Sequence, residues 1–255
     1  IVIWAIAMLA LATSCSTTKV LQDDEYRLAK NSIEVTNDRS FNTASLSPYL
    51  KQKPNPSIIF GWNPFLSVYN WTNGKGKGWD KLVQKVGQAP VIYDAEMVDA
   101  TIGNICDHLE YRGYYGSTVD SEIKVKGKKV GVTYKVTLGK RYPIASLSYD
   151  LPEGGEFADV FMSDTSECTI RPGEYLSEAL LEEESERSSS FIRNAGFYDF
   201  NKNHYFFEAD TLSLPGQALL KLTVNEYTRN ENPSEGTPIR KFYINDVNIS
   251  YPNSL

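Results

Sequence analysis

Strict alternation of apolar and polar residues marks two strands between residues 118 and 138. In residues 118–125, Val119, Ile123 and Val125 alternate with polar or charged residues, and residues 130–138 repeat the pattern. Gly127-Lys128 between them is a hairpin turn signal. A period of two with one charged face predicts that each strand is covered on one side only.

A helical period precedes the two strands. Residues Ala95–Arg112 are expected to form a long helix with Asp94 as its cap and Gly113 just past its end. Its apolar stripe consists of Val98, Ile102, Ile105 and Leu109. A short helix is expected earlier, at Ala44–Lys51, where Ser45 or Ser47 can cap it.

The same order follows downstream. A short helix is expected near Glu156–Met162 and a long one from about Leu176 to Ala195, ending at Gly196-Phe197-Tyr198. The middle of the long helix is the weaker part, because Ser185 and Ser188 stand where the first helix has isoleucines. Strands are expected at about Asn203–Ala209 and Ala218–Asn225.

One further strand recurs down the chain. Residues 141–152 (RYPIASLSYDLP) align without a gap with residues 241–252 (KFYINDVNISYP), 241 − 141 = 100 residues apart. In an earlier copy, Ile33 and Val35 match Leu147 and Tyr149, so this opening strand is expected at about 28–35, 142–149 and 242–249. A break before its apolar pair predicts a kink or bulge. A recurring strand in similar surroundings indicates a tandem array of small modules, and such arrays usually position partners.

The repeats divide the chain into an α+β fold of two and a fraction modules, each with the order strand, helix, helix, strand, strand. The expected boundaries are module one at 26–140, module two at 141–228, a polar linker at 229–238 and the first strand of a truncated third module at 239–255. Module one contains an irregular insertion at 55–79 that is rich in aromatic residues, namely Phe60, Trp62, Phe65, Tyr69 and Trp71. Its Gly74–Gly78 run lacks the spacing of a phosphate loop and is expected to be a flexible basic loop.

The chain starts with an apolar stretch. Residues 1–14 carry no charge, are too short to span a bilayer, and have the length of a signal-peptide core. Thr13 and Ser14 before Cys15 resemble the lipobox of bacterial lipoproteins, which implies acylation of Cys15, with residues 15–25 as a tether. An ordinary secretory signal or a buried apolar helix is the alternative.

Composition excludes several functions. A net charge of −6 argues against nucleic acid as a partner. Cys106 and Cys168 have no metal-ligand spacing, so they either pair in an oxidising compartment or remain separate thiols. Neither His108 nor His204 has a Cys or a carboxylate pair at ligand spacing, because Cys106 and His108 point to different faces of a helix. Glu182–Glu184 with Glu186 is interpreted as a solvated helix face. We therefore expect no cofactor, no metal and no enzymatic activity.

The order of these elements resembles POTRA domains, the periplasmic part of the BamA/TamA outer-membrane protein assembly family. The resemblance covers about residues 15–255 and rests on Gly113-Tyr114, Gly196-Phe197, Tyr93, Pro172-Gly173 and the strands 130–138 and 220–227. The start at Cys15 and the stretch Leu46–Lys53 are similar to its lipidated TamL branch. The resemblance implies a lipid-anchored protein on the periplasmic side of the outer membrane and a downstream barrel that is not in this chain. The implied partners are unfolded β-barrel clients, outer-membrane lipid and a TamB-like protein.

An open sheet edge can take up an extended client strand by β-augmentation. The expected edges are residues 118–125 and 204–208, with the site residues Thr118, Val119, Asp120, Ile123, Val125, His204, Tyr205, Phe206 and Phe207. The alternative for the aromatic residues is packing under the long helix. Two other functions compete: a lipoprotein that binds a glycan or peptide through residues 60–79, and a cell-wall or lipid hydrolase.

Overall fold

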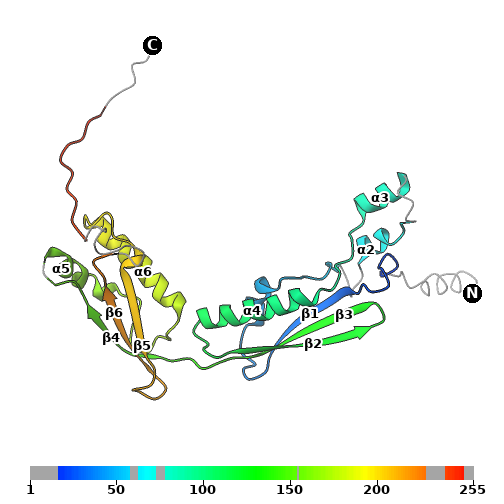
Figure 1. The fold of residues 1–255 in the computed structure, drawn as a ribbon, viewed down its shortest axis with the longest axis horizontal. Coiled ribbons are helices and arrows are strands. Elements are labelled where there is room, and N and C mark those ends of the chain that lie inside the picture. The colour runs from blue at the N-terminus through cyan, green and yellow to red at the C-terminus, as the bar shows by residue number, and fades with distance from the viewer. Residues whose placement is uncertain (1–16, 58–62, 73–77, 154, 228–238, 250–255) are drawn as a thin grey trace, which may run out of the picture. The chain divides into compact units, whose positions relative to one another are not determined.

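The computed structural model describes residues 17–57, 63–72, 78–153, 155–227 and 239–249. They form two compact units (Figure 1). Unit 1 comprises the residues up to His108 together with Ser117–Leu138, and unit 2 comprises Leu109–Gly116 and the residues from Gly139 onward.

Unit 1 is built on a three-stranded sheet of β1 (Arg27–Val35), β2 (Thr118–Lys126) and β3 (Lys129–Thr137). Its order is β1-β3-β2, with β3 parallel to β1 and antiparallel to β2. Lys126 pairs with Lys129 across a two-residue turn in which Gly127 has a φ of 59°, a left-handed conformation that suits glycine. The expected hairpin is confirmed.

Unit 2 repeats this topology with β4 (Ile144–Asp150), β5 (Tyr205–Asp210) and β6 (Ala218–Val224). The order is β4-β6-β5, and the central strand β6 is again parallel to the first strand and antiparallel to the edge strand β5. The α+β fold class and the strand-helix-helix-strand-strand order are therefore confirmed for both units.

The first strand of each unit contains the expected irregularity. The register shifts between Leu28 and Lys30 in β1 and between Ile144 and Ser146 in β4. Counted from this bulge, Ile33 corresponds to Tyr149, so the sequence alignment of Ile33 with Leu147 is wrong by two residues. A slip of two keeps every side chain on the same face, which is why the hydrophobic pattern alone did not reveal it.

Each sheet is packed on two helices. In unit 1 they are the 3-10 helix η1 (Thr43–Tyr49) and α4 (Ala95–Tyr111), which Figure 1 shows along one face of the sheet. Asp94 caps α4 through a 2.9 Å bond from the Glu96 N–H, as expected. The cap of η1 is Asn42, which precedes both of the expected serines and accepts the Ala44 N–H.

In unit 2 the two helices are α5 (Glu156–Ser163) and α6 (Glu178–Asn194), with the 3-10 turns η2 (Thr165–Glu167) and η3 (Lys202–His204) around them. The Ser177 hydroxyl caps α6 by accepting the Leu180 N–H. The helices and β6 enclose an apolar core in which aromatic rings dominate: Phe157, Phe161, Ile192, Phe197, Phe200, Tyr205, Leu222 and Val224.

The aromatic insertion is not irregular throughout. It contains α2 (Pro64–Tyr69) and the start of α3 (Gly78–Val86). Pro64 occupies the first turn of α2, where its missing N–H costs nothing, and Leu66 is buried. Elements of six and nine residues are too short for a helical period to stand out from a polar, glycine-rich context. Phe60, Trp62 and the Gly74–Lys77 run lie outside the described residues.

The expected third opening strand is absent: residues 242–249 form no strand. A strand requires a neighbouring strand for its backbone groups, and neither sheet of the described residues includes this segment. Cys15 and the apolar leader lie outside the described residues. Within the described part of the chain, the helices are all too short or too polar to cross a membrane.

Candidate strand-binding edges

The two edges of each sheet differ in how far they are covered. The outer side of β1 is joined at its start to the loop before α4, because the Leu28 N–H donates to Val91 O and the Tyr93 N–H to Tyr26 O, both at 2.7 Å. In unit 2 the same contact recurs: the Leu176 N–H donates to Tyr142 O at 2.9 Å, next to an isolated bridge between Pro143 and Tyr175. The bridge between Arg27 and Ile92 in unit 1 corresponds to this one, so Tyr175 occupies the place of Ile92 and Leu176 occupies that of Tyr93.

The opposite edges are β2 and β5, which have one strand neighbour each within the described residues. These are the two edges expected from the sequence. Both run antiparallel to the central strand, so an added antiparallel strand would continue the same ladder.

On β2 the polar face is strongly charged. Glu122 forms ion pairs with Lys135 at 2.8 Å and with Lys124 at 2.9 Å. The hydrogen bonds from these two lysines lower the pKa of Glu122 to about 2. Thr118 and Asp120 are exposed on the same face. Charges of this kind discourage indiscriminate pairing of an exposed edge.

The apolar face of β2 is only partly covered, contrary to the expectation of one covered side. Val119 is buried against the core, whereas Ile123 is 45% and Val125 is 58% exposed. The cover over this face thus ends between Val119 and Ile123, which leaves two β-branched side chains in solvent beside the charged row. Backbone and apolar contacts are both available here to an extended segment.

On β5 the expected site residues separate into two groups. His204 is buried in η3, stacks on Phe200 with ring centroids 4.8 Å apart, and its Nδ1 lies 2.9 Å from Asn225 O. Tyr205 is buried as well, and its hydroxyl donates to Ser188 Oγ at 2.8 Å. Burial raises the pKa of Tyr205 to about 12. Packing under the helix, the alternative for the aromatic residues, is correct for Tyr205, and the side chain of His204 is buried as well.

Phe206 is exposed and Phe207 is half-buried. Phe207 and Tyr205 line an open hollow of about 430 Å³ between α6 and β5, together with Leu181 and Ser185. Charged residues at the hollow are Glu178, Glu182 and Lys202. An apolar floor with a mixed-charge rim can accommodate alternate side chains of a strand lying along β5.

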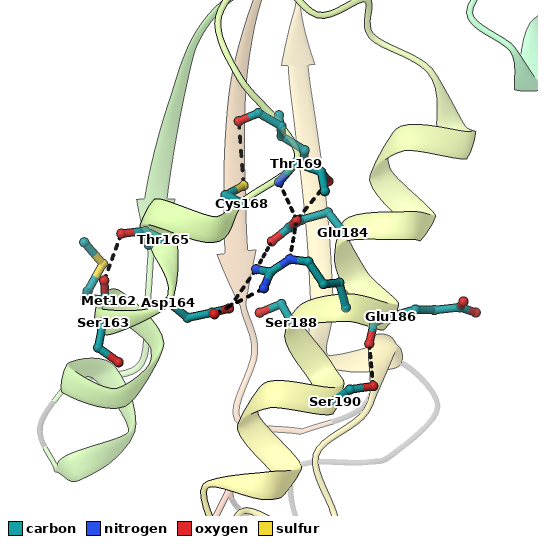
Figure 2. A network of polar contacts seen from close by, with 12 residues as sticks. Met162, Ser163, Asp164, Thr165, Cys168, Thr169, Glu184, Glu186, Ser188 and Ser190 are labelled. Atoms are coloured by element: carbon teal, nitrogen blue, oxygen red, sulfur yellow. Dashed lines mark hydrogen bonds and ion pairs between the residues drawn. The ribbon is translucent and has the colours of Figure 1, made fainter.

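A buried charge network fixes the loop beside this region. Figure 2 shows Glu184 of α6 directed toward Thr169, whose N–H and hydroxyl donate to Glu184 Oε2 at 2.8 and 2.9 Å. Arg187 bonds both Glu184 oxygens and forms a bidentate pair with Asp164. Burial favours a higher pKa for Glu184, but the hydrogen bonds from Arg187 and Thr169 outweigh it, so the pKa is lowered.

Glu184 is 3% exposed, so reading this glutamate as part of a solvated face is wrong. The overlooked signal was Arg187 one turn later, which gives a buried carboxylate a partner on its own helix. Glu182 and Glu186 do face solvent and pair with Lys202. The hydrogen bonds from Thr169 and Arg187 to Glu184 join α6 to the loop before it, which gives the network a structural role.

Other site chemistry is not found in the described residues. They contain no group of three or more His, Cys, Asp or Glu side chains placed to hold a metal ion. Cys106 and Cys168 form no disulfide, and burial raises the pKa of the Cys168 thiol.

No family model matches the chain, and no curated protein matches it either. Among solved structures, the chain is similar to BamA from Haemophilus ducreyi lacking POTRA domains 1–3, with 16% identity over 80% of this chain and a TM-score of 0.39. The chain spans 30% of the length of that structure. Haemophilus influenzae BamA POTRA3-5 is 12% identical over 81% of this chain and 100% of its own, with a TM-score of 0.31. CdiB from Escherichia coli is 12% identical over 84% of this chain and 30% of its own, with a TM-score of 0.27. Similarities this low do not establish a shared function, so a functional inference has to rest on the chain's own residues.

Proposed function

We propose that this chain is the POTRA array of an outer-membrane protein assembly or translocation factor of the BamA/TamA family, in its lipidated TamL branch. It is anchored through Cys15 on the periplasmic side of the outer membrane. Its modules bind unfolded β-barrel clients, and a TamB-like protein, by β-augmentation at β2 and β5. It acts as a scaffold and not as an enzyme.

The observation that carries the proposal is the repetition of one edge. Both units place an antiparallel strand at the sheet edge opposite the strand that the loop before the long helix covers. Main-chain hydrogen bonds tolerate any client sequence, which suits a protein that handles many barrel precursors. Exposed apolar side chains lie on both edges, Ile123 and Val125 on β2 and Phe206 on β5.

Photo-cross-linking tests the strand-binding part. Ile123 and Phe206 are replaced singly by benzoylphenylalanine, and the protein is irradiated with a urea-unfolded outer-membrane barrel protein after dilution. Tyr198 is the control position, because it is an exposed aromatic residue outside the strands. Cross-linking at both edge positions several times above that at Tyr198 supports the proposal, and equal yields at all three positions refute it.

The anchor is tested separately. Mass spectrometry of the N-terminal peptide from membranes is expected to find Cys15 as the acylated first residue, and Cys15→Ala is expected to release the protein from the membrane. An unmodified Cys15 in membrane-bound protein would refute the anchor while leaving strand binding untouched.

A further inference from the structure

The α2–α3 pair, residues 64–72 and 78–86, has four large apolar side chains that are about half exposed in the part of the chain that the structure describes. Phe65 is 51%, Trp71 54%, Leu82 56% and Val86 54% exposed. Phe65 belongs to α2, Trp71 follows that helix, and Leu82 and Val86 belong to α3. Exposed apolar residues gathered in one short stretch of chain indicate an interaction surface.

The solvent-facing side of α3 carries both apolar and basic side chains. Asp80 and Val83 are buried, while Leu82 and Val86 lie one turn apart on an exposed side with Lys81 and Lys85 next to them. A helix that offers apolar residues flanked by lysines is suited to lie in the interface of a bilayer.

The charge of the segment has the sign that anionic lipid requires. Among the described residues of the pair, the charged side chains are Asp80, Lys81 and Lys85, a net charge of 2 − 1 = +1 in a chain whose net charge is −6. Asp80 is buried, whereas both lysines are exposed. Tryptophan and lysine are also the residues that favour the headgroup region.

The two helices are held together as one body. The Gln88 N–H donates to Phe65 O at 3.0 Å, and a Cβ added at Gly87 would lie 2.6 Å from Tyr69 N. The backbones thus approach at a distance that only glycine allows, and Phe65 is fixed to the end of α3.

The start of the described chain is attached to the same pair. The Val20 N–H donates to Asn70 Oδ1 at 3.3 Å, and Lys128 Nζ holds the Gln22 and Asp23 carbonyls. Val20 is five positions after Cys15, and a fully extended chain covers about 18 Å over five residue steps. An acyl chain on Cys15 would therefore enter the bilayer within about 18 Å of Val20.

We propose that the α2–α3 pair binds the surface of an anionic phospholipid bilayer as a second attachment beside the lipid anchor. The inference rests on the proposed function for the anchor at Cys15. A basic and partly apolar surface adds electrostatic attraction to anionic lipid, and buried apolar area, to the attachment that acylation provides. The pair would then hold unit 1 at the membrane, in place of allowing it to hang from a flexible tether.

Intrinsic fluorescence reports on this segment alone. Of the four tryptophans, only Trp4 lies outside residues 62–79, so the full chain with Trp4→Phe needs no label. The protein is mixed with vesicles of phosphatidylethanolamine and phosphatidylglycerol whose acyl chains carry bromine, a quencher of tryptophan. Flotation of the vesicles measures the anchor independently.

We expect quenching by brominated anionic vesicles and at least twofold weaker quenching after Leu82→Ser with Val86→Ser. Lys81→Ala with Lys85→Ala is expected to weaken the binding of non-acylated protein about 30-fold. Ile244→Ser with Val247→Ser is the matched control, because both residues are exposed and lie far along the chain. This control is expected to leave the quenching unchanged.

The outcomes separate the two proposals. Protein that floats with vesicles without quenching keeps its anchor and overturns the inference. Quenching of protein whose Cys15 is unmodified supports the inference and refutes the anchor. A fluorescence change caused by a soluble oligosaccharide such as maltoheptaose, without quenching by vesicles, would assign the pair to glycan binding and overturn the inference.

Discussion

Replacing Glu184 by alanine is expected to destabilise unit 2 by about 3 kcal/mol. Glu184 accepts four hydrogen bonds, two from Thr169 and two from Arg187, at distances between 2.7 and 3.0 Å. Breaking a buried ion pair typically costs about 3–5 kcal/mol, because the remaining charge loses its partner. Arg187 keeps Asp164 and is 27% exposed, which places the cost at the lower end of that range.

The matched control is Glu186→Ala on the same helix. The side chain of Glu186 is 62% exposed and forms a surface ion pair with Lys202, an interaction that contributes about 0–1 kcal/mol. Glu184→Gln keeps the shape and removes the charge, so its effect is expected to lie between those of the two alanine variants. Comparing the three separates the loss of charge from the loss of packing.

The assay must follow unit 2 separately, since a chain of two units need not unfold in one step. All tryptophans precede residue 80, so fluorescence follows unit 1, while hydrogen exchange of peptides from β4 and β6 follows unit 2. With a slope of about 1.5 kcal/mol per M urea, the expected loss lowers the unit 2 midpoint by about 2 M. Midpoints for Glu184→Ala and Glu186→Ala that agree within about 0.3 M would refute the reasoning.

Three further results are expected. Because the folded pKa of Glu184 is lowered from 4.5, the stability that its charge contributes to unit 2 is fully present above pH 4.5 and is lost as the pH falls through the folded pKa. The urea midpoint of unit 2 should therefore fall on acidification, and it should fall less in Glu184→Gln. Gly113→Ala should destabilise unit 2 by well over the about 1 kcal/mol that an alanine in the left-handed region costs, because its Cβ would lie 2.2 Å from Leu176 O. Gly116→Ala is the control and should cost about 1 kcal/mol, because its Cβ would meet no atom within 4 Å. Equal urea midpoints for the two variants would contradict this reasoning. Leu222→Ala, in the buried core of unit 2, should cost about 2–5 kcal/mol by the same exchange assay, and a loss under 1 kcal/mol would contradict the assigned core.

The elements with a strong period could be predicted from the sequence. The hairpin of β2 and β3 follows from strict alternation around Gly127, and α4 from its stripe, its Asp94 cap and Gly113. These signals are local, since each depends on neighbours a few residues away. The short helices α2 and α3 have no such period, and contacts between them, such as Gly87 against Tyr69, stabilise them instead.

Burial of polar side chains could not be predicted. Ser188 stands on the inner face of α6, where the equivalent helix has an isoleucine, and it is buried because the Tyr205 hydroxyl reaches it from β5. Glu184 is buried because Arg187 and Thr169 satisfy it. The groups that satisfy Ser188 and Glu184 are brought to them largely by packing across the unit. The local sequence pattern does not contain this information, so it predicted a weak helix centre and a solvated face.

The candidate strand-binding edges could also be predicted only in part. Topology placed β2 and β5 at sheet edges, and alternation indicated which strands these were. The exposure of individual residues depended on where the helical cover ends, so Ile123 is accessible and His204 is not. Edge position can therefore be inferred from repeats, whereas the residues that a partner contacts require the packed structure.

The repeat itself has a structural role in unit 2 that the alignment did not reveal. The Gly-aromatic turn after a long helix meets the base-aromatic segment that opens the next repeat: Tyr115 and Lys140 exchange backbone hydrogen bonds at 3.0 and 2.9 Å. At the next repeat the Phe242 N–H donates to Gly196 O at 2.8 Å. The residues that pair are not equivalent, because the first contact uses the second residue after Gly113 and the second contact uses Gly196 itself. In both places the turn after the long helix provides a backbone partner for the segment that opens the next repeat, so the two motifs that recur in the sequence contact each other in the structure.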